Sequence, residues 1–342
     1  MALPPDPARN LAQTVERLTF RVGPADAAGR IDRFLAARLP WRSRTGVQRL
    51  LEEGRVLVAA AGAAETGVKR AATRLPEGAT VVVITKHPRV PLPRLDARVG
   101  ELSIVHEDEW LLAVDKPPGL AAHPAGRHLY DTLITVLHRR YRSDDPARDV
   151  VPRLCHRLDR ETSGVVLVSK DEDVRHHLGR QFEDRKIEKE YLAIVEGAPD
   201  RDAGVIDRPI GRARDSRVKV KMAIDPRGQH AVTRYEVVER AGALSLVRCR
   251  PLTGRQHQIR VHLAAIGHPV VGDKIYGPDE SLFLDSLAGS LDDEKRRLLR
   301  LGRHALHAHR LTFTHPKTGE RLTVTAPLPE DLRTLLASAL ER

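Results

Sequence analysis

Cysteine is scarce in this chain of 342 residues, and the two present, Cys155 and Cys249, are too few for a disulfide framework. Their spacing is not that of metal ligands. The longest weakly polar run, VLVAAAGAA at 56–64, is too short to cross a bilayer. The first residues, MALPPDPARNLAQ, lack the apolar core of a signal peptide. We therefore expect a protein of the reducing cytoplasm that does not bind membranes.

Several common catalytic motifs are also missing. The chain has no GxxxxGK[ST] phosphate loop, no GxGxxG turn, no HExxH or CxxC motif and no GxSxG elbow. We therefore predict no metal and no cofactor. Five histidines match no common metal-site spacing, and we interpret them as solvated or RNA-facing side chains: His257, His262, His304, His307 and His309.

Positive charge, in contrast, is abundant. The chain contains 57 lysines and arginines against 46 aspartates and glutamates, which gives a formal net charge of +11. Basic side chains bind phosphates and release their counterions, so an excess of this size favours a polyanionic partner. A basic surface with no such partner is the alternative, and composition alone leaves both open.

A change in composition indicates two domains, as expected for a chain of this length. The stretch HPRVPLPRLDARVG at 87–100 has three prolines and several charges, which are typical of an extended linker. We therefore predict a small basic domain at 1–86, with its core at about 16–86, and a second domain at 101–342.

The first of these domains shows two amphipathic helical patterns. One contains Ile31, Phe34 and Leu35 and the other Val47, Leu50 and Leu51. Short apolar strands are expected at 55–58 and 80–84. Because the apolar residues claim the buried faces, most of the seven arginines between Gly29 and Val56 must share the outer face.

The motifs RIDRFLA, Ser43-Arg44 and QRLLEEGRVLV in this region resemble the small RNA-binding domain named after a ribosomal small-subunit protein. The resemblance implies a small α/β unit that binds RNA. A solvated, charged helix pair is the alternative. The side chains we expect to bind RNA are Arg30, Arg33, Arg38, Arg42, Arg44 and Arg49.

The second domain reads as α+β, because frequent strands are joined by short turns and interrupted by helices. EKEYLAIVEG is strand-like, and QHAVTRYEVVER with ALSLVRCRPL predicts a hairpin. Two capping boxes, Ser169 to Glu172 and Thr253 to Gln256, predict where two helices begin.

The stretch CHRLDRETSGVVLVSK at 155–170 places a carboxylate between arginines just before an apolar run. Asp159 could form a surface salt bridge of little energetic value. It could also be a nucleophile that a guanidinium keeps ionised in a phosphate-binding site. The residues alone favour the salt bridge.

Five motifs in order along the chain resemble the pseudouridine synthases of the large-ribosomal-RNA and tRNA type. They are VDKPPGLAAHP, HRLDRETSG, EKEYLAIVEG, LTGRQHQIRVHLAAIGHPVVGDKIYG and HALHAHRLTFTHPKTGE. The likeness extends from about residue 101 to residue 330. It implies that family's central, largely antiparallel sheet with an active-site cleft.

The resemblance also implies the site. Asp159 matches the catalytic aspartate, Tyr191 the active-site tyrosine and Arg260 the arginine that pairs with the aspartate. Arg157 matches the arginine that enters the RNA helix and helps displace the target uridine. Attack on the sugar, attack on the base and glycal formation all remain open as routes for Asp159.

We therefore predict an enzyme that isomerises uridines in structured RNA, and we expect a monomer. The extra basic domain favours large-subunit ribosomal RNA over tRNA by analogy. Two other classes remain: a catalytically silent RNA-binding or ribosome-assembly factor, and a hydrolase acting on another nucleoside bond. Intact Asp159 and Arg260 disfavour the first, and the lack of a second acid at a recognisable spacing disfavours the second.

Overall fold

The chain divides into two compact units, one of Met1–Arg94 with Thr135–Val151 and one of Leu95–Ile134 with Pro152–Arg342. The predicted linker at 87–100 lies outside the described part of the chain. No helix in that described part is both long and apolar enough to span a membrane. The computed structural model describes residues 15–39, 44–60, 63–86, 102–124, 132–143, 145 and 148–341.

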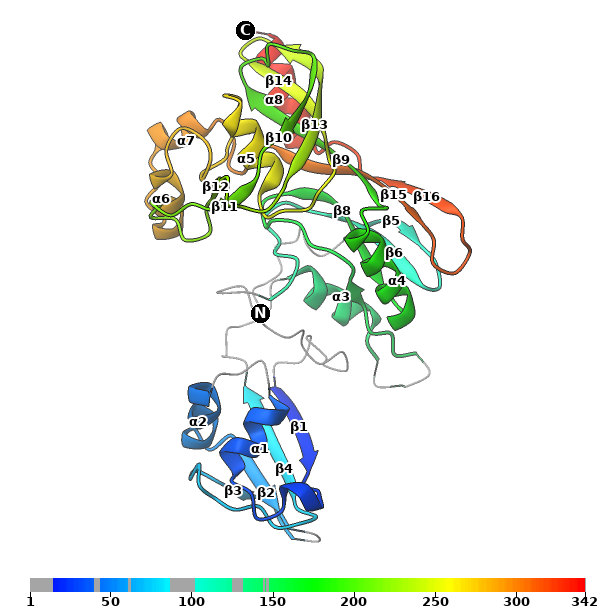
Figure 1. The fold of residues 1–342 in the computed structure, drawn as a ribbon, viewed down its shortest axis with the longest axis vertical. Coiled ribbons are helices and arrows are strands. Elements are labelled where there is room, and N and C mark those ends of the chain that lie inside the picture. The colour runs from blue at the N-terminus through cyan, green and yellow to red at the C-terminus, as the bar shows by residue number, and fades with distance from the viewer. Residues whose placement is uncertain are drawn as a thin grey trace. The chain divides into compact units, whose positions relative to one another are not determined.

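The described residues 15–86 of the N-terminal unit form a sheet of strand order β1-β4-β2-β3 and the helices α1 and α2 (Figure 1). The apolar faces predicted for the two helices are buried against the sheet residues Val56, Val81 and Val83, so both helices are confirmed. The strands β1 and β3 were not predicted. The elements are β1 (Val15–Arg21), η1 (Pro24–Asp26), α1 (Ile31–Arg38), α2 (Arg44–Glu52), β2 (Val56–Ala59), β3 (Thr66–Gly67) and β4 (Thr80–Lys86).

The larger unit is built on one long sheet of order β10-β13-β14-β9-β15-β8-β6-β5, with β16 beside β15 and β7 beside β8 (Figure 1). Its pairings are antiparallel except for β15 with β8. The predicted α+β class and largely antiparallel sheet are confirmed. The strands are β5 (Ser103–Glu107), β6 (Leu111–Lys116), β7 (Arg153–Leu154), β8 (Ser163–Ser169), β9 (Glu188–Glu196), β10 (Ala203–Asp207), β13 (Val232–Ala241), β14 (Leu244–Pro251), β15 (Leu306–Thr314) and β16 (Arg321–Thr325).

Helices and one small ribbon accompany this sheet. Helices α5 and α8 both contact β13 and β14, while α4 contacts β7 and β8. The two-stranded ribbon of β11 (Ile210–Arg212) and β12 (Met222–Ile224) lies beside α5 (Figure 1). The helices are α4 (Glu172–Glu183), α5 (Gln258–Ala265), α6 (Ser281–Ala288), α7 (Asp293–Leu299) and α8 (Glu330–Leu340). Helix α3 (Leu133–Tyr141) begins in the larger unit, but from Thr135 onward it belongs to the N-terminal unit.

Both predicted capping boxes are wrong. Ser169 ends β8, and the side chain of Asp171 caps α4 by accepting from the backbone N–H of Val174. Helix α5 begins only at Gln258, and Thr253 instead donates its hydroxyl to the Gln258 side chain at 2.7 Å. In each case a Ser or Thr found another polar partner, so the helix began two or more residues later.

Candidate active site

The HRLD turn is fixed to the most buried strand of the large unit. All seven residues of β8 are buried. The Nε2 of His156 accepts from the backbone N–H of Leu167 at 3.0 Å, and its ring packs against Phe182 with centroids 4.7 Å apart. Burial lowers the pKa of His156 to about 3, so this nitrogen remains an acceptor at neutral pH. The turn that carries Asp159 therefore starts from a rigid base.

Gly164 makes a close strand pairing possible. Its φ is +110°, and a Cβ there would lie 2.2 Å from the carbonyl oxygen of Ala308. The parallel pairing of β15 with β8 runs through these two residues. A side chain would separate the strands, so the glycine of the TSG motif is required by packing.

A buried lysine ties the KPPG segment to the same turn. The side chain of Lys116 is fully buried, and its ammonium donates to the carbonyls of Pro117 and Leu120 at 2.9 Å and of Arg160 at 3.1 Å. Burial lowers its pKa to about 7; the charge of Arg303 adds to the shift and that of Asp159 opposes it. The ammonium thus adds to the backbone hydrogen bond from Gly119 to Arg160 in joining the two segments.

Arg260 and Asp159 form the predicted pair. The Nη1 of Arg260, on α5, lies 2.9 Å from Oδ2 of Asp159. The Arg260 side chain is only 5% exposed, whereas that of Asp159 is 32% exposed. The carboxylate of Asp159 is thus held by a buried guanidinium, while part of it remains exposed to solvent.

Asp273 is a functional residue that the sequence reasoning missed. Its carboxylate takes the other edge of the Arg260 fork, with Nε at 2.6 Å and Nη2 at 2.8 Å. The Oδ1 of Asp273 also accepts from the backbone N–H groups of Ile275 and Tyr276. The signal was an acid directly after a glycine in GDKIYG, within the arginine motif. This bidentate contact fixes the guanidinium plane and leaves Nη1 free to donate to Asp159.

The charges set the ionisation of the site. Burial alone would raise the pKa of Asp159, but Arg260, His257 and His304 outweigh it and leave the pKa below its usual value. The pKa of Asp273 is lowered far more, since burial is overcome by the charge and hydrogen bonds of Arg260. Both carboxylates are therefore ionised at neutral pH.

A second ion pair joins the same two segments. The ammonium of Lys274 lies 2.9 Å from Oε1 of Glu161 and 2.7 Å from the carbonyl oxygen of Gly302. The neighbouring hydroxyl of Thr162 lies 2.7 Å from Nε2 of His304. The residues that follow Asp159 are thereby connected both to the GDKIYG segment and to His304, which precedes β15.

Tyr191 lies in the middle of β9, where it pairs with Cys249 of β14 and Ala308 of β15. Burial raises the pKa of its phenol, and the negative charge of Asp159 raises it further. The hydroxyl is therefore protonated at neutral pH. The effect of Asp159 on this pKa indicates that the two groups lie within electrostatic reach of each other, and the catalytic role of Tyr191 stays a prediction.

Arg157 is exposed on the HRLD turn. Within the described part of the chain, no ion pair engages its guanidinium. Its neighbour Arg160 contacts Glu161 at 3.6 Å. Arg157 is thus the arginine of this turn whose side chain is available to a partner.

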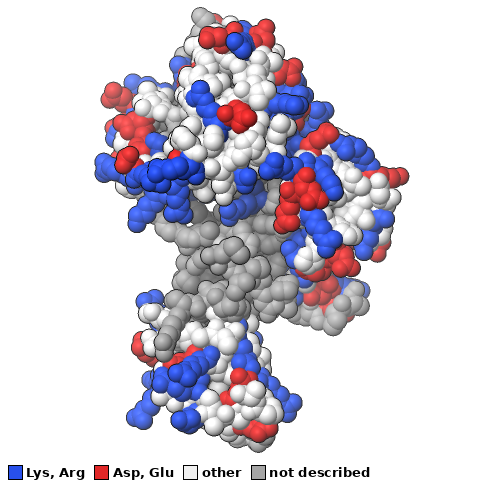
Figure 2. Space-filling model, in the orientation of Figure 1, with Lys and Arg blue, Asp and Glu red and all other residues white. Residues whose placement is uncertain are grey.

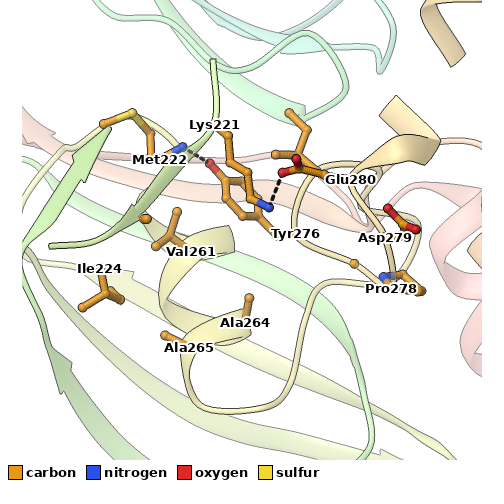
Figure 3. A pocket seen from close by; sticks show the side chains of 13 residues that line it. Lys221, Met222, Ile224, Val261, Ala264, Ala265, Tyr276, Pro278, Asp279 and Glu280 are labelled. Atoms are coloured by element: carbon orange, nitrogen blue, oxygen red, sulfur yellow. Dashed lines mark hydrogen bonds and ion pairs between the residues drawn. The ribbon is translucent and has the colours of Figure 1, made fainter. Parts of the chain in front are cut away.

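Tyr276 forms the boundary between this site and a pocket. Its ring lies 5.0 Å from the guanidinium carbon of Arg260. Tyr276 also lines a pocket of about 350 Å³ whose wall includes the apolar residues Met222, Ile224 and Val261 (Figure 3). An ion pair of Lys221 with Glu280, at 2.7 Å, lies at the edge of this pocket (Figure 3).

The interpretation of the histidines as solvated or RNA-facing is wrong. His262, His304 and His307 are buried, and His257 and His309 are partly buried. The two ring nitrogens of His262, for example, contact the Thr233 hydroxyl and the Arg208 carbonyl oxygen, both at 2.9 Å. A neutral imidazole can satisfy two buried polar groups, which spacing in the sequence does not reveal. Among the described residues, no cluster of three or more His, Cys, Asp or Glu could hold a metal ion.

Four of the six arginines predicted to bind RNA fall into two groups. Arg30 pairs with Asp32 at 2.8 Å, and Arg38 pairs with Asp26 and stacks on Phe34. Arg33 and Arg49 are exposed, with no ion pair to any described residue. Arg42 lies outside the described residues, and Arg44 begins α2. Basic and acidic side chains are interspersed on both units in the face shown in Figure 2.

Comparison with known proteins gives a consistent result. A family model described as RNA pseudouridylate synthase matches residues 110–265. An uncharacterized RNA pseudouridine synthase of Chloroflexus aurantiacus is 38% identical over 332 residues, which are 97% of this chain and 96% of that protein. A ribosomal large subunit pseudouridine synthase D of Nitrosomonas europaea is 36% identical over 338 residues, or 97% and 91% of the two chains. The solved structure of human RNA pseudouridylate synthase domain containing 4 matches with a TM-score of 0.55 and 29% identity, over 72% of this chain and 97% of that one.

Proposed function

The chain belongs to the RNA pseudouridylate synthase family, and from this membership we propose that the uridines it isomerises lie in large-subunit ribosomal RNA. The proposal is supported by the relative from Nitrosomonas europaea, whose name specifies the large ribosomal subunit. The observation that supports this chemistry is that Asp159 is ionised and partly exposed to solvent, with its Oδ2 held 2.9 Å from Nη1 of Arg260.

The roles of the site residues follow from their surroundings. Asp159 acts on the uridine, because it is the ionised carboxylate of this site that keeps solvent access. Arg260 keeps it charged and oriented. Tyr191 offers an aromatic face for the uracil and a protonated hydroxyl. Base flipping vacates a position in the RNA helix, and the exposed side chain of Arg157 is placed to fill it.

The N-terminal unit serves as an RNA-binding domain at 1–86, joined by a linker at 87–100 to a catalytic domain at 101–342. Exposed Arg33 and Arg49 contribute phosphate contacts of this domain. Arg30 and Arg38 contribute less, because each is already paired with an aspartate. The enzyme works as a cytoplasmic monomer without a membrane partner.

Pseudouridine mapping tests the substrate. Ribosomal RNA and tRNA are compared between cells with the gene, cells without it, and cells complemented with Asp159→Asn. We expect specific pseudouridines of the large-subunit RNA to disappear in the second and third strains. Loss confined to tRNA would assign the enzyme to tRNA. Retention of every site in the Asp159→Asn strain would indicate an RNA-binding or assembly factor.

A further inference from the structure

We propose that His257 is a positioning residue for the reaction, whose Nε2–H supports the same oxygen of Asp159 that Arg260 holds, so that Oδ1 is left to act on uridine. This inference rests on the role proposed for Asp159. Three observations support it: the backbone position of His257, the hydrogen bonds of Tyr276 that fix the imidazole tautomer, and the fact that His257 and Arg260 both face Oδ2 of Asp159.

His257 is held in an unusual position. It immediately precedes α5 with φ 57° and ψ 15°, which is left-handed backbone that residues with side chains adopt infrequently. Its side chain is only 9% exposed, and its ring packs edge-on against Tyr276 with centroids 5.6 Å apart. The sequence therefore keeps an imidazole where a residue such as glycine would be conformationally easier.

The neighbours of His257 determine where its proton lies. The hydroxyl oxygen of Tyr276 accepts from the backbone N–H of Met222 at 2.9 Å (Figure 3) and lies 2.8 Å from Nδ1 of His257. Among the described residues, Nδ1 is the acceptor in reach of the phenolic proton. Tyr276 therefore donates to Nδ1, and a neutral imidazole must carry its own proton on Nε2. Burial lowers the pKa of His257, so the ring is neutral at pH 7.

This Nε2–H faces the catalytic carboxylate. Nε2 lies 3.9 Å from Oδ2 of Asp159, the oxygen that also accepts from Arg260 at 2.9 Å. No hydrogen bond to Oδ1 of Asp159 is made within the described part of the chain. A movement of about 1 Å would bring Nε2 into hydrogen-bond range, and catalytic contacts commonly tighten when substrate binds. Two donors on Oδ2 would direct Oδ1 towards the substrate.

The charged and titratable groups around the pair come from several elements. Asp159 is influenced by Arg260 of α5, by His257, and by His304 before β15. It in turn influences Lys116 of β6 and Tyr191 of β9. His257 is influenced by Asp159, Arg260 and Asp273. Because Arg260 remains when His257 is replaced, we expect a moderate effect on the ionisation of Asp159.

Two substitutions distinguish a role of His257 as a hydrogen-bond donor to Asp159 from a role in filling space. The amide nitrogen of His257→Gln can occupy the Nε2 position, whereas that of His257→Asn reaches only the Nδ1 position. Asparagine is also better suited to left-handed backbone, so strain cannot explain a defect of His257→Asn alone. We expect His257→Asn to lower kcat by about 10–100-fold, the equivalent of one hydrogen bond to a charged group, with KM unchanged. The acid limb of its pH–rate profile should move upward, and His257→Gln should recover most of the activity.

Tyr276→Phe provides the second measurement, since it removes the proton that fixes the imidazole tautomer. We expect a smaller loss of kcat than for His257→Asn, and no further loss when the two changes are combined. Wild-type kcat and acid limb in His257→Asn would overturn the proposal, as would equal defects in the Asn and Gln variants. A non-cooperative unfolding curve would reveal that the Asn variant is not folded. In that case, the proposal is overturned if Tyr276→Phe keeps the wild-type pH–rate profile and its effect on kcat adds to that of His257→Gln. Failure of the underlying function is distinguishable, because the parent enzyme would then retain turnover after Asp159→Asn.

Discussion

The HRLD turn and the helix pair α1–α2 use arginine in opposite ways. At the turn, Arg260 is 5% exposed and is shared by two carboxylates, Asp159 and Asp273. On the helix pair, Arg33 and Arg49 are exposed and engage no carboxylate of the described residues. A buried guanidinium has one geometry and acts over a few ångströms, whereas an exposed one acts through the summed field of its unit. The first arrangement suits chemistry at one atom, and the second suits affinity for a polyanion.

Replacement of Asp159 by asparagine should have the largest effect. Shape and most contacts are kept, but the ionised oxygen is lost, so kcat should fall by about 10⁴-fold or more, as when an essential catalytic group is removed. Single-turnover assays on the substrate RNA would measure this, with RNA affinity as a second readout. Asp173→Asn, on the exposed face of α4, is the matched control and should retain full activity. Multiple turnovers by Asp159→Asn would contradict the assignment.

Arg260→Met should come next, because it leaves two carboxylates without their cation. Breaking such a buried pair typically costs about 3–5 kcal/mol. Since Arg260 lowers the pKa of Asp159, its loss raises that pKa, and the acid limb of the pH–rate profile moves to higher pH. Arg260→Lys should restore part of the activity, because it keeps the charge without the fork.

A control for Arg260→Met is Arg248→Met, which removes one of several arginines around Glu190. It should reduce stability without moving the acid limb. An acid limb that stays in place in Arg260→Met would argue against the pairing as the source of the ionisation of Asp159.

The carboxylates of Asp159 and Asp273 also predict that the wild-type protein loses stability in acid. The pKa values of Asp159 and Asp273 are lowered by folding, so their stabilisation is present above the unfolded pKa and is lost as pH falls towards the folded values.

Gly164→Ala tests the packing beneath the turn. A Cβ would lie 2.2 Å from the Ala308 oxygen at a φ of +110°, so we expect a loss of about 3 kcal/mol in the free energy of unfolding. Gly179→Ala in α4 is the matched control: nothing lies within 4 Å of its Cβ, and helix propensity should make it neutral or stabilising. Denaturant unfolding measures both. Equal stabilities would mean that the two strands separate easily.

The smallest effect is expected on the helix pair. Arg33→Gln combined with Arg49→Gln should weaken RNA binding several-fold and reduce its salt slope by about 1.4–1.8, if each arginine makes one phosphate contact. The unfolding free energy and kcat on a short substrate should be unchanged. Arg21→Gln with Arg70→Gln removes the same charge from exposed positions outside the two helices. If both pairs weaken binding equally, only net charge matters and the helix pair is not a specific RNA surface.

The sequence predicted most of what depends on local pattern or on matched motifs. Periodicity located α1 and α2, alternation located the β13–β14 hairpin, and the family motifs brought Asp159 and Arg260 together. It did not reveal Asp273 or Lys116, whose roles depend on burial and on partners outside their own turn or strand, namely the guanidinium of Arg260 and the carbonyl of Arg160. It misplaced the starts of α4 and α5 for another reason, since Ser169 and Thr253 bond to Asp171 and Gln258 and the capping-box pattern does not distinguish these local partners from a helix cap.

The position of β15 has a consequence for how the enzyme folds during synthesis. This strand, at 306–314, is synthesised more than a hundred residues after β8 and β9, yet it lies between them in the middle of the sheet. Until it is inserted, the strand that carries Tyr191 and the strand that follows Asp159 have no common neighbour. Pairings of such long sequence separation form slowly, and a growing chain folds from its N-terminus. The N-terminal unit can therefore fold before the ribosome has delivered the strand that joins the two parts of the active site.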